Sequence, residues 1–82
     1  MAVLHNVGRQ IEKIDQQLIT LIEQRVALCQ DAVEDDPTAL GPEHEGETIG
    51  YFQEEAEHRG LDEGDMIRIG KSIIAICKKR AA

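Results

Sequence analysis

Apolar residues recur along the first third of the chain with the spacing of one helix face. Steps of three and four residues alternate without interruption from Leu4 to Ala32, and eight of these nine positions are apolar. The positions are Leu4, Val7, Ile11, Ile14, Leu18, Leu21, Arg25, Leu28 and Ala32. A repeat near 3.5 residues predicts a long amphipathic helix that packs along a partner helix. We expect this helix to begin between Leu4 and Asn6, with Asn6 as a candidate N-cap, and to end between Asp31 and Glu34.

One position on this face carries a charge. Arg25 stands where the pattern predicts an apolar side chain. The guanidinium group keeps its proton in proteins, so a buried arginine needs an anion beside it. That anion is either a carboxylate of another helix, for which Glu45 and Glu55 are candidates, or a bound ligand.

The predicted helix is too long for a compact domain of this size. About 28 residues rising 1.5 Å each span about 42 Å, whereas a compact chain of 82 residues has a radius of gyration of about 12 Å. We therefore expect a homodimer, with this helix as a major part of the interface. Arg9 and Arg25 lie about 24 Å apart along the helix. They would meet at one ligand only between the two chains of an antiparallel dimer.

Two further helices are predicted after an acidic connection. Residues 35–47 contain two prolines and two glycines, so we expect a loop there, whose mobility the sequence leaves open. A short helix is predicted from Glu47 to His58, with Thr48 as the cap of a slightly later start. Gly60 suits the left-handed position after that helix, and Asp62 is placed to cap a medium-length third helix.

Composition supports an all-α fold in a single domain, residues 1–82. The chain has no tryptophan, one tyrosine and one phenylalanine, so its core must be aliphatic, which suits packed helices. No apolar run approaches the roughly 18 residues of a membrane span. The N-terminus lacks the basic start and apolar block of a signal peptide, so a cytoplasmic protein is expected.

The net charge of −7 argues against nucleic acid as a partner. Residues 31–65 hold thirteen acidic residues and one basic residue, and residues 66–82 hold five basic residues and no acidic one. A nucleic-acid-binding protein needs a larger basic face. The basic end of the chain complements the acidic middle and the C-terminal dipole of its own helix.

The remaining candidate chemistry is weak. Cys29 and Cys77 each fall in an apolar helical pattern, where small buried side chains are the simplest interpretation. A disulfide between them would require an oxidising compartment. Glu55 and His58 have the Glu-x-x-His spacing of metal-binding helix bundles, but the second such motif is missing, so a solvated acidic face is favoured. No metal and no cofactor is expected.

The first helix resembles that of the all-α chorismate mutases. The segment RQIEKIDQQLITLIEQRVAL, residues 9–28, has the arginine near the start, the Ile-Asp pair, the leucine-rich stretch and the Glu-x-Arg of that family. Gly60-Leu61-Asp62, followed by an apolar helix, is similar too. The motif in the first helix is moderately specific, and the similarity beyond it is weak.

This resemblance implies an intertwined helical dimer of the chorismate mutase type, with two equivalent sites. Each site would convert chorismate to prephenate, a step of aromatic amino acid biosynthesis, by a pericyclic rearrangement without covalent catalysis. In the family, arginines clamp two carboxylates, and a cation and a donor face the breaking ether oxygen. Arg25 matches the family's second arginine of the first helix.

Several positions depart from the family pattern. The family's first arginine aligns with Gly8, one residue before Arg9, which is about 100° around the helix. Its lysine aligns with Asp36, so the cation at the ether oxygen is missing unless Lys78 or Arg80 substitutes. The family's Arg-Glu pair falls on His44 and Glu45, where Glu45 retains the ability to bind the substrate hydroxyl. The family's serine and glutamine of the last helix fall on Cys77 and near Ala81.

Two functions therefore remain open. The first is a chorismate mutase, or a relative acting on a similar dicarboxylate, with Arg25 and Glu45 as catalytic residues and Arg9, Arg25, His44 and Glu45 binding the substrate. The second is a non-catalytic helical dimer that uses the same scaffold as a binding or regulatory module. The missing lysine favours the second and the retained arginine favours the first. A generic helical adaptor unrelated to this family is a third, weaker alternative.

Overall fold

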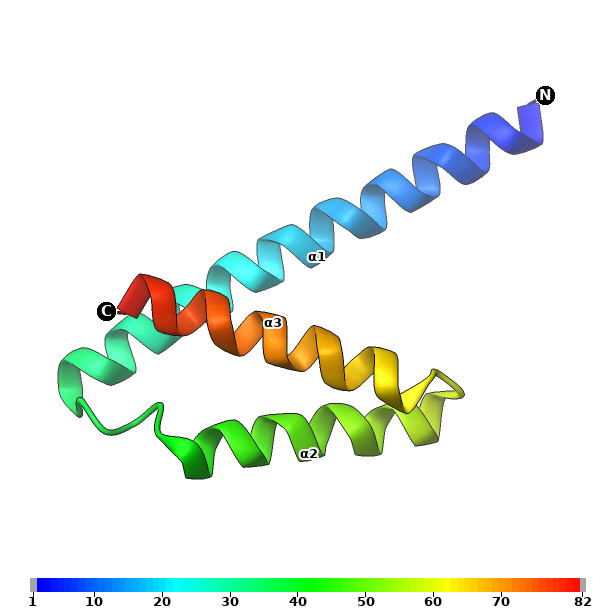
Figure 1. Cartoon of the computed structure of the whole chain (residues 1–82). Coiled ribbons are helices and arrows are strands. Elements are labelled where there is room, and N and C mark those ends of the chain that lie inside the picture. The colour runs from blue at the N-terminus through cyan, green and yellow to red at the C-terminus, as the bar shows by residue number, and fades with distance from the viewer. Residues whose placement is uncertain (1, 82) are drawn as a thin grey trace.

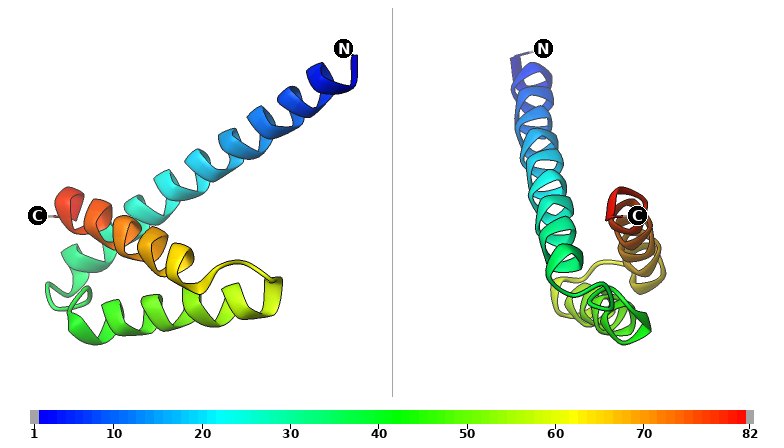
Figure 2. Two further views of the ribbon diagram at one scale, coloured as in Figure 1. Left: turned by 45° about the vertical axis from the view of Figure 1, so that its right-hand side comes forward. Right: turned by 90° about the vertical axis from the view of Figure 1, so that its left-hand side faces the viewer.

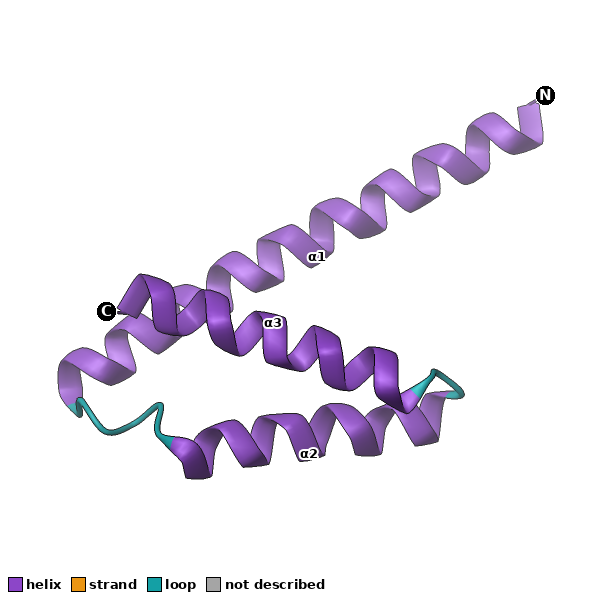
Figure 3. Cartoon of the chain, in the orientation of Figure 1, coloured by secondary structure: helices purple, strands orange, loops and turns teal. Residues whose placement is uncertain are grey.

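Three helices make up the computed structural model, which describes the backbone of residues 2–81 and the side chains of residues 6–80. They are α1 (Ala2–Asp35), α2 (Pro42–Arg59) and α3 (Glu63–Ala81), joined by two short loops (Figure 3). The described residues include no strand. The all-α prediction and the order of the helices are confirmed, although α2 is as long as α3 and not short.

The helices α2 and α3 form an antiparallel pair, and α1 crosses α3 (Figure 1). Only the C-terminal part of α1 lies against α3, while its N-terminal part projects away from the other helices (Figure 2). Within residues 2–81, no helix is long and apolar enough to cross a membrane.

Helix α1 is longer at its start than the sequence predicted. It is already helical at Ala2, so Asn6 lies inside the helix and the prediction that Asn6 is an N-cap is wrong. No proline or turn sequence before Asn6 opposes the extension. The side chain of Leu4, the first position of the predicted apolar face, lies outside the described residues.

The loop between α1 and α2 is shorter than predicted. Residues 36–41 form it, and Asp36 stabilises its turn by accepting hydrogen bonds from the backbone N–H and the hydroxyl of Thr38, at 3.0 and 2.8 Å. These bonds hold the pKa of Asp36 below its usual value. Helix α2 begins at Pro42, so residues 42–47 of the predicted loop are helical and Thr48 is not a cap. Proline suits the first position of a helix, because its missing N–H would have no partner there.

The turn between α2 and α3 follows the sequence prediction. Gly60 adopts the left-handed conformation, with φ of 69°, and its N–H bonds the carbonyl of Ala56. A residue without Cβ adopts this conformation without strain. The carboxylate of Asp62 then accepts the N–H of Asp65 at 2.8 Å, which caps α3 as predicted.

The core of the protomer is small. Only Cys29, Ala56, Ile74 and Cys77 are buried hydrophobic side chains among those described. Gly70 is also buried, and it lets α3 approach the ring of Phe52 on α2. Such a core gives limited stability to a chain of this size.

Most of the predicted apolar face of α1 is exposed in the protomer. Leu18 is 52% exposed and Leu28 is 68% exposed, whereas Arg25 is half-buried against α3. The exposed members of this face are Val7, Ile11, Ile14, Leu18, Leu21 and Leu28. The protomer measures 52 × 25 × 15 Å, with a radius of gyration of 15.5 Å, well above the value of about 12 Å for a compact chain.

Replacing Gly70 with valine tests the contact between α2 and α3. A Cβ at Gly70 would lie 3.2 Å from Cγ of Phe52, so the larger side chain of Gly70→Val must push the helices apart. We expect a loss of about 2 kcal/mol in the free energy of unfolding, measured by urea denaturation. Gly50→Ala is the matched control, because Gly50 lies in open space on α2 and should gain about 1 kcal/mol from helix propensity. A neutral effect of Gly70→Val would contradict this packing.

Candidate functional site

The guanidinium group of Arg25 reaches from α1 toward both other helices. Its Nη1 donates to Sγ of Cys77 at 3.0 Å and to Sγ of Cys29 at 3.6 Å. Its Nη2 donates to Oγ1 of Thr48 on α2 at 3.4 Å. The side chain is half-buried where α1 crosses α3. Arg25 is therefore held at the junction of the three helices.

No carboxylate neutralises Arg25 within the described part of the protomer. Glu45 instead bonds Nζ of Lys78 at 3.1 Å, and Glu55 bonds Arg59 at 2.9 Å. The interpretation in which Arg25 pairs with Glu45 or Glu55 of its own chain is therefore wrong in this structure. Sulfur and hydroxyl groups are uncharged acceptors, and sulfur is a weak one. The positive charge of Arg25 is thus available to an anion.

A narrow cleft opens beside this arginine. It lies where the start of α2 faces the C-terminal half of α3, and its accessible volume of about 10 Å³ holds no more than a water molecule. A larger ligand can enter only if the surrounding helices move apart. The residues around it are Arg25, Leu40, His44, Glu45, Ile74, Cys77 and Lys78. Three of the four predicted site residues, Arg25, His44 and Glu45, are therefore brought together.

Arg9 is the predicted site residue that the protomer does not bring to the cleft. It is exposed on the projecting part of α1, about 24 Å from Arg25 along the helix. Arg9 does not reach the cleft of its own chain.

Lys78 supplies a second cation at the cleft, and Arg80 does not line it. The side chain of Lys78 is 56% exposed and that of Glu45 is 29% exposed, so their ion pair bridges α2 and α3 at the surface. The sequence offered both Lys78 and Arg80 as substitutes for the missing lysine. The choice between them depends on how α3 packs against the other helices. Gln30 of α1 also contacts α3 by donating to the carbonyl of Arg80 at 3.2 Å.

Arg25 has three hydrogen-bond partners, Cys29, Cys77 and Thr48, and none of them was predicted from the sequence. Thr48 was considered only as a helix cap, because the start of α2 was placed too late. Cys77 was taken as a small core residue. Cys77 is buried in the core, with 2% of its surface exposed, but its sulfur also accepts a hydrogen bond from Arg25. The alignment of Cys77 with a polar site residue of the chorismate mutases was the signal that pointed to this contact.

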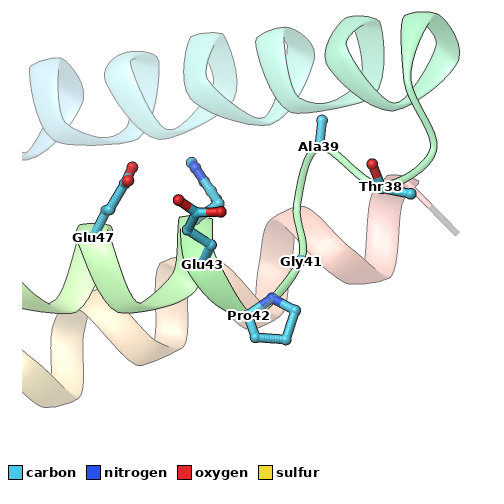
Figure 4. Close-up of a pocket in the computed structure, with 7 residues that line it drawn as sticks. Thr38, Ala39, Gly41, Pro42, Glu43 and Glu47 are labelled. Carbon is cyan, nitrogen blue, oxygen red and sulfur yellow. The ribbon is translucent and has the colours of Figure 1, made fainter.

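A neighbouring hollow has the opposite charge character. The residues around it are Thr38, Ala39, Gly41, Pro42, Glu43, His44 and Glu47, and Figure 4 shows Glu43 and Glu47 projecting into it from α2 toward α1. These two carboxylates would repel an anionic ligand. The Arg25 cleft is therefore the better candidate for a dicarboxylate.

The Glu-x-x-His segment of α2 forms no metal site in this structure. Glu55 is engaged by Arg59 one helical turn away, and His58 is exposed. Within the described residues, no group of three or more histidine, cysteine, aspartate or glutamate side chains is placed to hold a metal ion.

Substituting Arg25 with methionine tests whether the arginine lowers the free energy of unfolding. Methionine has a similar length and removes a half-buried charge that lacks a carboxylate, so Arg25→Met should raise the free energy of unfolding by about 1 kcal/mol. Arg59→Met is the control, because Arg59 pairs at the exposed surface, and it should change stability by less than about 0.5 kcal/mol. A loss of several kcal/mol in Arg25→Met, measured by urea denaturation, would identify Arg25 as a structural residue instead.

Comparison with known families gives a match. The family model of chorismate mutase type II matches residues 7–82, which include most of α1, all of the described α2 and α3, and every residue of the cleft. Comparisons with curated proteins and with solved structures gave no significant match. The three-helix architecture is the one that the family resemblance implied. The chain therefore belongs to the chorismate mutase type II family.

Proposed function

We propose that the chain rearranges chorismate to prephenate, or acts on a similar small dicarboxylate, in the cytoplasm as part of aromatic amino acid biosynthesis. The observation that carries this proposal is the cleft beside Arg25, where a guanidinium without a carboxylate partner faces Lys78, His44 and Glu45. An anion bound there would supply the negative charge that balances Arg25.

Each polar residue of the cleft has a role in this proposal. Arg25 binds one carboxylate of the substrate, which holds the reacting atoms in the compact conformer. Lys78 replaces the family lysine and stabilises the negative charge that develops on the ether oxygen as its bond breaks. Glu45 accepts a hydrogen bond from the substrate hydroxyl, and His44 contributes to substrate binding. Asp36, at the position of the family lysine, accepts a hydrogen bond from Thr38. Its carboxylate is negative, so it cannot replace the lysine.

The proposed active form is a homodimer. The exposed apolar face of α1 is long enough to pair with a second copy, and burying it would enlarge the small core of the protomer. Arg9 lies about 200° around α1 from Val7 and Ile11, on the side away from this interface, so the second carboxylate is not assigned to Arg9 of the partner chain.

Charging the apolar face tests the dimer. Leu18→Asp would place a carboxylate in the proposed interface, so the variant should sediment as a monomer of 9.1 kDa in analytical ultracentrifugation while the parent chain sediments at twice that mass. Gln16→Asp is the control, because Gln16 lies about 200° from Leu18 around the helix, and this variant should remain dimeric. A monomeric parent chain would contradict the proposal.

The reaction itself is tested by following the conversion of chorismate to prephenate. The parent chain should turn over chorismate, and Arg25→Ala and Lys78→Ala should each reduce kcat/KM by about 10²- to 10³-fold. Lys78→Arg should recover part of the loss, because it keeps the positive charge. Lys79→Ala is the matched control, since Lys79 is an exposed neighbour on α3 that does not line the cleft.

A non-catalytic binding or regulatory module is the second candidate function. It is favoured by the departures at Gly8 and Asp36, which remove two cations of the family pattern. In that case the protein would show no turnover, but chorismate or prephenate would raise Tm, and Arg25→Ala would abolish the shift. Absence of both turnover and a shift would exclude both functions for this cleft.

A further inference from the structure

The two cysteines of the chain meet at the junction of α1 and α3. Cys29 is 7% exposed and Cys77 is 2% exposed, and both are free thiols. They come from different helices, far apart in the sequence, yet both sulfurs accept a hydrogen bond from the same nitrogen, Nη1 of Arg25, at 3.6 and 3.0 Å. One guanidinium nitrogen therefore brings the only two sulfhydryl groups of the chain together.

The titration behaviour of Cys29 agrees with this proximity. Burial raises the pKa of the Cys29 thiol, the neighbouring Cys77 raises it further, and Arg25 acts in the opposite direction. The backbone around the pair is ordered helix on both sides, and Gln30 ties α1 to the end of α3. Cys77 also lines the cleft beside Arg25, whose accessible volume is about 10 Å³, so a peroxide reaches the pair when the helices open locally.

We propose that Cys29 and Cys77 form a reversible oxidation site, at which a hydroperoxide closes a disulfide between α1 and α3 beside Arg25. This inference rests on the helix contact and not on the proposed mutase activity. It differs from a structural disulfide, because both cysteines are free thiols in the structure, and a reducing compartment would restore them.

The reaction balances with hydrogen peroxide as the oxidant. The thiolate of one cysteine attacks a peroxide oxygen, the O–O bond breaks, and the departing hydroxide takes up the thiol proton as water. The second cysteine then attacks the resulting sulfenic acid sulfur, so that the S–S bond forms and the S–O bond breaks. The second hydroxide leaves with the second thiol proton as another water. Two thiols and one peroxide thus give one disulfide and two waters.

Oxidation would change the surroundings of Arg25. In the reduced chain both sulfurs accept a hydrogen bond from Nη1 of Arg25. A disulfide would bond these two sulfurs to each other and change their positions. The guanidinium would then turn toward Thr48 or into the cleft. Ligand binding at the cleft should therefore differ between the reduced and oxidised forms.

The test compares the full chain after treatment with dithiothreitol and with hydrogen peroxide. We expect peroxide to remove both thiols at once, measured by thiol titration of the unfolded chain, with a mass loss of two hydrogens in a single chain. Dithiothreitol should reverse both changes. The disulfide closes a long loop, so the oxidised chain should unfold at least about 10 °C above the reduced chain.

The variants Cys29→Ser and Cys77→Ser are matched controls. Each keeps one thiol, so neither should show a peroxide-dependent rise in Tm. Oxygen adducts on a single cysteine, disulfide-linked pairs of chains, or two unreacted thiols in the parent protein would each overturn the proposal. All of these measurements are made without substrate, so a chain without mutase activity would still give a decisive result.

Discussion

The central interaction of this structure is made by a guanidinium that has no carboxylate partner among residues 6–80. Arg25 lies where α1 crosses α3, and its acceptors are two sulfurs and the hydroxyl of Thr48 on α2. The positive charge of Arg25 is poorly compensated there, because thiol and hydroxyl groups carry no negative charge. The fold tolerates this cost where α1 crosses α3 and the side chain of Arg25 also reaches α2. That is the physical basis for the proposal that an anionic ligand binds at the cleft and not at the exposed acidic faces.

The shape of the protomer follows from the same helix. The C-terminal part of α1 packs against α3, and the rest of the helix carries an exposed apolar face. Arg25 and Cys29 lie in the part that contacts α3, whereas Arg9 lies in the N-terminal part and is exposed. One helix therefore contributes both a group of the cleft and an exposed apolar face.

The sequence predicted most of the fold because the decisive signals are local. The helical repeat of α1, the left-handed Gly60 and the capping Asp62 each depend on a few neighbouring residues. The start of α2 was misplaced because Pro42, which suits the first position of a helix, was taken as part of a loop. The cleft was predicted only in part, since Ile74 and Cys77 line it through the packing of helices distant in sequence, and Lys78 was predicted only as one of two alternatives. Such packing has no signature in the spacing of residues along one helix.

The ion pair between Lys78 and Glu45 gives the cleft an unusual response to salt. These two groups bridge α2 and α3 at 3.1 Å, near enough to the surface for ions to weaken their attraction. A dicarboxylate entering the cleft must compete with Glu45 for Lys78. Added salt screens the ligand from the cations, but it also weakens this competitor. The two effects oppose each other, so affinity should depend on ionic strength less steeply than it would in a cleft whose lysine had no internal counterion.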